Sequence, residues 1–145
     1  MNGWLKPDEP QSFRILRLHA PENEKILLDF QPLRKSAVPD WNPMPEDWSC
    51  YREPLRIYQQ DYALLLPYFA RIYPTADAFD GTPEPAFDPC FSNWIGRKDW
   101  EIILQAIDAE MPLHPAQEQT FFRSFSDWLR AALQDTDIIV VTGNL

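Results

Sequence analysis

The sequence predicts an α+β fold in which a mainly helical single domain carries a small β-sheet or hairpin. The length of 145 residues is typical of one domain, which we place at residues 1–145. Hydrophobic residues make up 45% of the chain and aromatic residues 14%, enough for a core without disulfides or metals. Apolar residues at helical spacing dominate the second half, whereas alternating segments are few and short.

The N-terminal part is expected to provide the hairpin. Two prolines mark a loose arm at about residues 1–11. Residues 13–18 alternate in part, and residues 25–30 form a second strand candidate. The turn-like segment 21–23 lies between them, so the two segments could pair as a hairpin.

Prolines make the next segment irregular. Five of them fall between residues 32 and 54, and each disfavours a helical conformation in the residue before it. We therefore expect a long loop with single helical turns, and a second such stretch at residues 74–89. Three aromatic residues of the first stretch are expected to pack on the body: Trp41, Trp48 and Tyr51.

A helical face is predicted between these two stretches. Its apolar side chains follow a 4-3-4-3 spacing, at Tyr58, Tyr62, Leu65, Phe69 and Ile72. Pro67 lies inside the run, and a proline within a helix removes a hydrogen bond and clashes with the preceding turn. We expect a kink or a break that leaves two short helices.

Residues 88–96 have the terminal residues of a short helix. Asp88 suits the N-cap, Pro89 the first helical position, and Gly96 the residue after the end. This assignment places Cys90 in the core as a small, inert thiol, and Trp94 on a core-facing stripe.

Two longer helices and a strand complete the predicted fold. One apolar stripe comprises Trp100, Ile103, Leu104, Ile107 and Met111, and Pro112 ends it. A second comprises Phe121, Phe122, Phe125, Trp128, Leu129, Ala132 and Leu133. The β-branched run at residues 138–141 predicts a buried strand.

Charge is divided unevenly along the chain. The net charge is −9, which argues against direct binding of nucleic acid, because phosphate recognition needs basic residues. Residues 1–71 carry ten acidic and nine basic residues, a net charge of −1. Residues 72–145 carry twelve acidic and four basic residues, a net charge of −8. The acidity therefore belongs to the C-terminal half.

Composition favours a cytoplasmic location with reduced thiols. The two cysteines, Cys50 and Cys90, are too few for a disulfide framework. The first residues contain no apolar segment of signal-peptide length. The longest apolar runs are far too short to cross a bilayer, so no membrane association is expected.

Metal and cofactor sites are not predicted. Residues 77–84 hold two aspartates and a glycine, but their spacing differs from that of a helix-loop-helix calcium site, and two prolines stiffen the segment. The cysteines and histidines lack the close pairing typical of zinc ligands. With four glycines in the chain, a phosphate-binding loop is not expected either.

No catalytic residue is predicted, and the chain is not expected to be an enzyme. One alternative stays open, a small hydrolase in which Cys90 meets His114 or His19 in the fold. Paired carboxylates could also serve acid–base catalysis, but spacing cannot select a pair among twenty-two acidic residues.

Four segments of the C-terminal part carry a resemblance to a known family. The segments that carry this resemblance are FDPCFSNWI at 87–95, DW at 99–100, FFRSFSDWL at 121–129 and DIIVVTGNL at 137–145. Over residues 87–145 the chain resembles small bacterial immunity proteins encoded beside polymorphic or contact-dependent growth-inhibition toxins. The resemblance implies that the protein binds and neutralises a cognate toxin, for instance a nuclease, without catalytic residues or a cofactor. An acidic surface would suit the basic cleft of such a toxin.

The binding surface is expected in the acidic half, where several carboxylates flank helix ends. The candidate partner-binding residues are Asp77, Asp80, Glu84, Asp108, Glu110, Asp135 and Asp137. Trp41 and Trp48 are candidate aromatic anchors, because tryptophan concentrates where protein interfaces are strongest. A non-catalytic adaptor without a toxin partner is the main alternative function.

Overall fold

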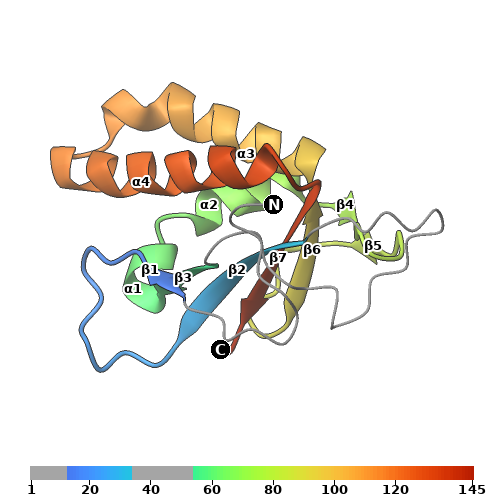
Figure 1. Cartoon of the computed structure of the whole chain (residues 1–145), viewed down its shortest axis with the longest axis horizontal. Coiled ribbons are helices and arrows are strands. Elements are labelled where there is room, and N and C mark those ends of the chain that lie inside the picture. The colour runs from blue at the N-terminus through green and yellow to red at the C-terminus, as the bar shows by residue number, and fades with distance from the viewer. Residues whose placement is uncertain (1–12, 34–53) are drawn as a thin grey trace.

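The computed structural model describes residues 13–33 and 54–145 and has two layers, a β-sheet and the helices that cover one of its faces (Figure 1). The strands are β1 (Arg14–Ile15), β2 (Leu27–Leu33), β3 (Leu55–Tyr58), β4 (Thr75–Ala76), β5 (Pro83–Glu84), β6 (Ser92–Gly96) and β7 (Ile138–Gly143). The helices are α1 (Gln59–Tyr62), α2 (Leu66–Phe69), α3 (Arg97–Glu110) and α4 (Ala116–Leu133). Two 3-10 helices, η2 (Ala70–Ile72) and η3 (Met111–Leu113), follow α2 and α3.

The prediction of a mainly helical domain with a small sheet or hairpin is wrong. The described residues form a mixed α/β fold, with a five-stranded sheet in the order β1-β3-β2-β7-β6, a two-stranded sheet β4-β5, and four α-helices. Several strands are too short for alternation to reveal them, since β1 has two residues and β3 four. The sheet is instead assembled from segments far apart in the chain, such as β2 and β7.

The predicted hairpin does not form. β3 lies between β1 and β2, parallel to β1 and antiparallel to β2. The chain leaves the sheet after β1 because the buried Asp61 carboxylate accepts three successive backbone N–H groups, from Leu18 (2.7 Å), His19 (2.6 Å) and Ala20 (3.3 Å). These donors are therefore satisfied by a side chain of α1 and not by β2.

The C-terminal strand is buried on both faces, as predicted. β7 is antiparallel to β2 on one side and to β6 on the other. Ile139 and Val141 belong to the core under the helices, whereas Ile138 and Val140 pack with Leu33 on the opposite face. A β-branched run without polar alternation is typical of such a strand.

Both long helices are confirmed. α3 and α4 run side by side over the sheet (Figure 1), and their predicted apolar stripes face the core. Phe30 of β2 lies at the centre of this core. Four aromatic rings surround it with centroid distances of 5.5–6.3 Å: Phe69, Trp100, Phe125 and Trp128.

The helical run around Pro67 is broken, as its sequence predicts. α1 ends at Tyr62, and α2 begins at Leu66 with Pro67 in its first turn, where the missing N–H costs nothing. Tyr62, Leu65, Phe69 and Ile72 all reach the core. Tyr58, predicted on the same helical face, is instead the last residue of strand β3.

The predicted helix at 88–96 is wrong. Ser92–Gly96 is strand β6, which pairs with β7 from Ser92↔Thr142 to Gly96↔Ile138. The Asp88 carboxylate accepts the Cys90 N–H (2.8 Å), so Asp88 stabilises a turn and does not cap a helix. Cys90 is exposed rather than buried.

Trp94 is also placed differently from the prediction. It is half-buried on the sheet face away from the helices, where it packs beside Ala78, Ile138 and Val140. The ring centroids of Trp94 and Phe79 are 4.8 Å apart.

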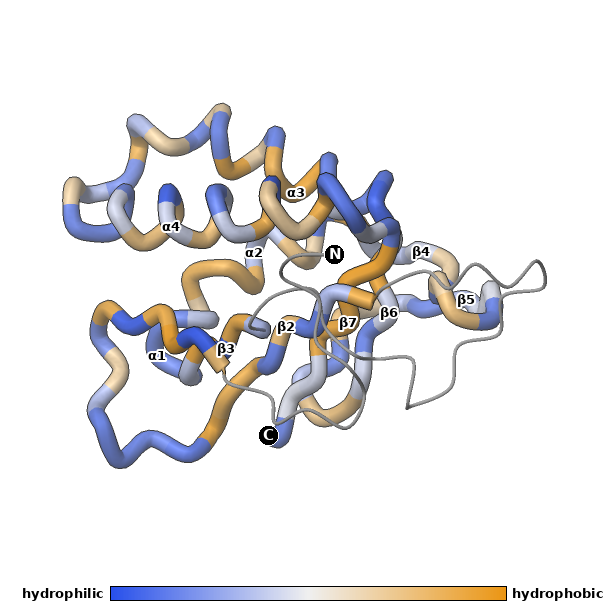
Figure 2. Tube along the Cα trace, viewed as in Figure 1, coloured by the Kyte–Doolittle hydropathy of each residue, from blue (hydrophilic) through white to orange (hydrophobic). Residues whose placement is uncertain are grey.

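The hydropathy along the chain agrees with the positions of the buried and exposed segments. In Figure 2 the hydrophobic colour runs along the start of β7, whereas the loop from β1 to β2 is mostly hydrophilic. Among the described residues, none of the helices combines the length and apolar composition needed to cross a membrane. The predicted arm at residues 1–11 and most of the first proline-rich stretch lie outside the described residues.

Candidate partner-binding site

An apolar pocket of about 430 Å³ opens beside α2, η2 and the chain that follows β5. Its lining residues are Leu66, Ala70, Tyr73, Pro85, Ala86, Phe87 and Pro89. This volume falls within the range of small-ligand sites in proteins. Ala70, Pro85 and Ala86 are exposed, so the apolar walls are open to solvent.

Helical geometry builds one wall of the pocket. Leu66 and Ala70 are four residues apart and share one side of the helical segment. Tyr68 and Phe69 on another side are buried in the core, which fixes the orientation of the segment. The wall is therefore anchored by side chains that do not themselves line the pocket.

The opposite wall is held by aromatic packing and by the end of the sheet. Phe87 contacts Phe69 and Tyr73, with ring centroids 5.1 and 6.5 Å apart. Next to it, the Pro89 carbonyl accepts the Leu145 N–H (3.3 Å). A Cβ on Gly143 would lie 1.9 Å from that same carbonyl oxygen, so only glycine permits β7 to pass so close to this wall.

Tyr73 is the polar residue of the pocket. Burial raises the pKa of its phenol, and the negative charges of Glu84, Asp99 and Asp77 raise it further. The charges that raise this pKa are those of carboxylates. Negative charge close to the Tyr73 hydroxyl favours a cationic neighbour.

The β4-β5 hairpin holds these carboxylates in place. Glu84 pairs with Thr75 in the ladder, and the Thr75 hydroxyl donates to the Asp99 carboxylate at the start of α3 (2.7 Å). The hairpin also contacts the main sheet, because the Ala78 N–H donates to the Trp94 carbonyl (3.0 Å). Glu84 and Asp99 therefore approach Tyr73 from two different elements.

Asp77 and Asp80 shape the hairpin turn. The Asp77 carboxylate accepts the Phe79 N–H (2.6 Å), and the Asp80 carboxylate accepts the Thr82 N–H (2.9 Å). Hydrogen bonds from Thr82 lower the pKa of Asp80, whereas burial raises the pKa of Asp77 against the opposing effect of the Phe79 N–H. Gly81 completes the turn with φ of 78°.

Two predicted acids lie at the other end of α3 and are paired with arginines. Glu110 forms an ion pair with Arg71, and Asp108 forms one with Arg130 of α4. α3 has 14 residues. At the rise of an α-helix its ends are roughly 20 Å apart, so these acids do not join the hairpin carboxylates in one surface.

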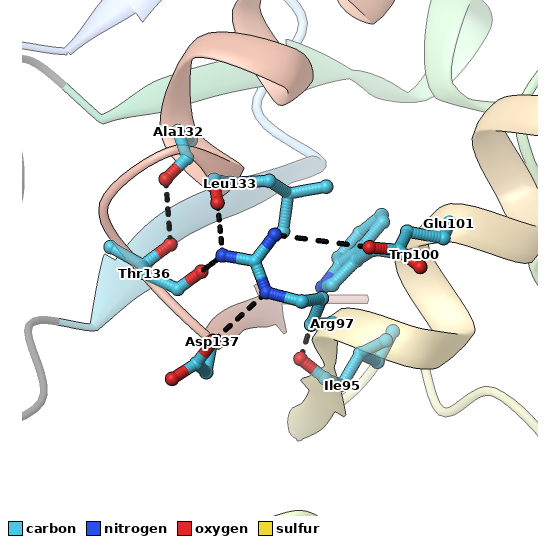
Figure 3. Close-up of polar contacts among 8 residues, drawn as sticks. All are labelled: Ile95, Arg97, Trp100, Glu101, Ala132, Leu133, Thr136 and Asp137. Atoms are coloured by element: carbon cyan, nitrogen blue, oxygen red, sulfur yellow. Dashed lines mark hydrogen bonds and ion pairs between the residues drawn. The ribbon is translucent and has the colours of Figure 1, made fainter.

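The last two predicted acids flank the start of β7. Asp135 is exposed after the end of α4, and Asp137 is paired with Arg97 (2.9 Å). Figure 3 shows that the Arg97 guanidinium also reaches the C-terminal end of α4, where it donates to the carbonyls of Leu133 and Thr136. Free carbonyls at a helix end are commonly satisfied in this way, so Asp137 orients a structural arginine.

The two predicted tryptophan anchors are not among the described residues, and His114 of the hydrolase alternative contacts Tyr68 and Phe122. Trp41 and Trp48 lie outside the described residues. The His114 Nε2 forms a 2.6 Å hydrogen bond with the Tyr68 hydroxyl, and its ring packs on Phe122 at 4.2 Å. Within the described ranges, no group of three or more histidine, cysteine or acidic residues is arranged to hold a metal ion.

Sequence reasoning missed the pocket itself. Its walls come from segments about twenty residues apart, and an aromatic residue between prolines, Phe87, is the signal that could have drawn attention to it. Comparison with models of known protein families, with curated protein sequences and with solved structures finds no match to this chain.

Proposed function

We propose that this protein is an immunity protein that binds and neutralises a protein toxin in the cytoplasm, with its acidic half as the binding region. The observation that carries the proposal is the open apolar pocket with carboxylates from the β4-β5 hairpin and α3 beside it. Protein interfaces draw their affinity from apolar anchors in pockets and their association rate from complementary charge. Both features occur here in one region.

The distribution of charge supports a basic partner. The net charge of residues 72–145 is −8, and the arginines nearest the hairpin and α2 are already paired with acids, Arg97 with Asp137 and Arg71 with Glu110. A toxin that cleaves nucleic acid needs a basic cleft, and an acidic protein bound there excludes the anionic substrate. Such inhibition requires neither a catalytic residue nor a cofactor.

Co-expression tests this proposal. Each reading frame adjacent to the gene is expressed in a bacterial host with and without this protein, and growth and complex formation are measured. We expect one frame to arrest growth alone, growth to resume when this protein is present, and the two products to co-elute on size exclusion. Persistent arrest with separate elution of the two proteins would contradict the proposal.

A further inference from the structure

We propose that the pocket binds an apolar side chain of the partner that is flanked by lysine or arginine. The inference rests on the proposed function for the identity of the partner, and it adds the chemistry that the pocket selects. Two features carry it, the unfilled apolar walls and the carboxylates next to the wall segment in the chain or close to Tyr73.

The walls provide the apolar half of the recognition. Leu66, Ala70, Ala86 and Phe87 line about 430 Å³ of space. Phe87 is fixed by Phe69 and Tyr73, so the pocket is preformed. A preformed pocket binds at a lower entropic cost than one that must order its walls.

Two exposed apolar residues lie near the pocket wall, one close in the chain and one through a backbone hydrogen bond. Phe91 is 69% exposed, and its backbone carbonyl accepts the Gly143 N–H. Leu145 is 54% exposed, and its N–H donates to Pro89 of the pocket wall. Exposed large apolar side chains beside a pocket favour a protein surface over a small metabolite as the occupant.

The carboxylates provide the charged half of the recognition. Glu84 and Asp88 flank the wall segment 85–87 in the chain, and Asp77 and Asp99 act on the Tyr73 hydroxyl. Lys98, the neighbour of Asp99 in the chain, is exposed in the first turn of α3 and carries one positive charge. A cation beside the bound apolar group would approach this negative region, whereas an anion would be repelled.

Three capped tripeptides separate the two requirements. Their sequences are Lys-Phe-Lys, Glu-Phe-Glu and Lys-Ala-Lys, and binding is followed by amide chemical shifts of the isotope-labelled full-length protein. We expect Lys-Phe-Lys to shift the amides of Ala70, Ala86 and Phe87 saturably. Its Kd should be about 5-fold below that of Glu-Phe-Glu at low salt, since two exposed charge contacts contribute about that factor. The ratio should shrink as salt rises, and Lys-Ala-Lys should not saturate.

A variant that fills the pocket tests the location. Ala70→Met places a longer side chain on the exposed helical wall, and Ala109→Met makes the same change at an exposed position of α3 away from the pocket. We expect Ala70→Met to raise the Kd of Lys-Phe-Lys about 5-fold or more by occlusion, and Ala109→Met to leave it unchanged.

Three results would overturn the inference: no shift of the pocket amides with Lys-Phe-Lys, equal or tighter binding of Glu-Phe-Glu, or an equal effect of both methionine variants. The titration uses no toxin, so a failure here leaves the co-expression test intact. Conversely, persistent growth arrest with normal peptide binding would reject toxin neutralisation and leave the pocket's selectivity standing.

Discussion

The two ends of α3 contain acidic residues in very different states. At its C-terminal end, Glu110 and Asp108 are paired with Arg71 and Arg130, so their charges are neutralised. At its N-terminal end, Asp99 accepts a neutral threonine hydroxyl and lies near Glu84 and Asp77 around Tyr73. A charge count along the chain therefore does not locate a binding surface, because ion pairing decides which acidic residues keep an uncompensated charge.

The largest effect on stability is expected where β7 passes the pocket wall, at Gly143. Gly143→Ala places a Cβ 1.9 Å from the Pro89 carbonyl oxygen and 2.9 Å from a Leu28 methyl. Backbone must move to relieve this contact, so we expect a loss of about 3 kcal/mol in the free energy of unfolding, measured by urea denaturation.

Gly96→Ala is the matched control for this change. A Cβ at Gly96 would meet its nearest atom at 3.7 Å, an ordinary contact. We expect a loss below about 1 kcal/mol for this helix N-cap position. Equal losses for the two alanine variants would show that β7 does not support the pocket wall.

A pair of glutamate variants compares the two ends directly. Glu110→Gln removes the ion pair with Arg71 and should lower the free energy of unfolding by about 0.5–1 kcal/mol, because that pair is partly exposed. Glu84→Gln removes one of several neighbouring negative charges and should change the stability by less than about 0.5 kcal/mol. The same denaturation experiment checks both, and a larger loss for Glu84→Gln would contradict the assignment of Glu84 to a surface that is not needed for folding.

The smallest effect is expected in the pH dependence of stability. Burial and the adjacent carboxylates raise the pKa of Tyr73 above its ordinary value of 10.0. The contribution of protonated Tyr73 to the free energy of unfolding is therefore fully present below pH 10. It is lost as the pH rises further, because Tyr73 releases its proton at a lower pH in the unfolded chain than in the folded one. We expect Tyr73→Phe to flatten the decline of the free energy of unfolding between about pH 9 and 11. An unchanged slope in Tyr73→Phe would mean that neither burial nor the adjacent carboxylates raise the pKa of Tyr73.

The parts of the fold that could be predicted are the long ones. α3 and α4 carry apolar residues over several turns, so their period identifies them without tertiary information. β7 could be recognised because four β-branched residues in a row fit a strand buried on both faces.

The parts that could not be predicted depend on partners distant in the chain. The segment of β6 has the cap residues of a helix around it, Asp88 and Pro89 before the strand and Gly96 at its end, and only pairing with β7, more than forty residues away, makes it a strand. β3 separates β1 from β2 for the same kind of reason, because Asp61 draws the chain after β1 out of the sheet.

The candidate site was predictable in part. Asp77, Asp80 and Glu84 were chosen from their sequence region, and the structure places all three on one hairpin, two of them near Tyr73. Asp108 could not be recognised as neutralised, since Arg130 lies on another helix. Pairing of this kind requires the packing of α3 against α4, which composition does not reveal.

The location of the binding surface is tested by comparing how tightly the two glutamate variants bind the peptide. We predict that Glu84→Gln raises the Kd of Lys-Phe-Lys about 2- to 3-fold at low salt, as the loss of one exposed charge contact implies, and that Glu110→Gln leaves this Kd unchanged. An unchanged Kd in Glu84→Gln, or an equal rise in Glu110→Gln, would contradict the claim that the hairpin end of α3 forms the binding surface.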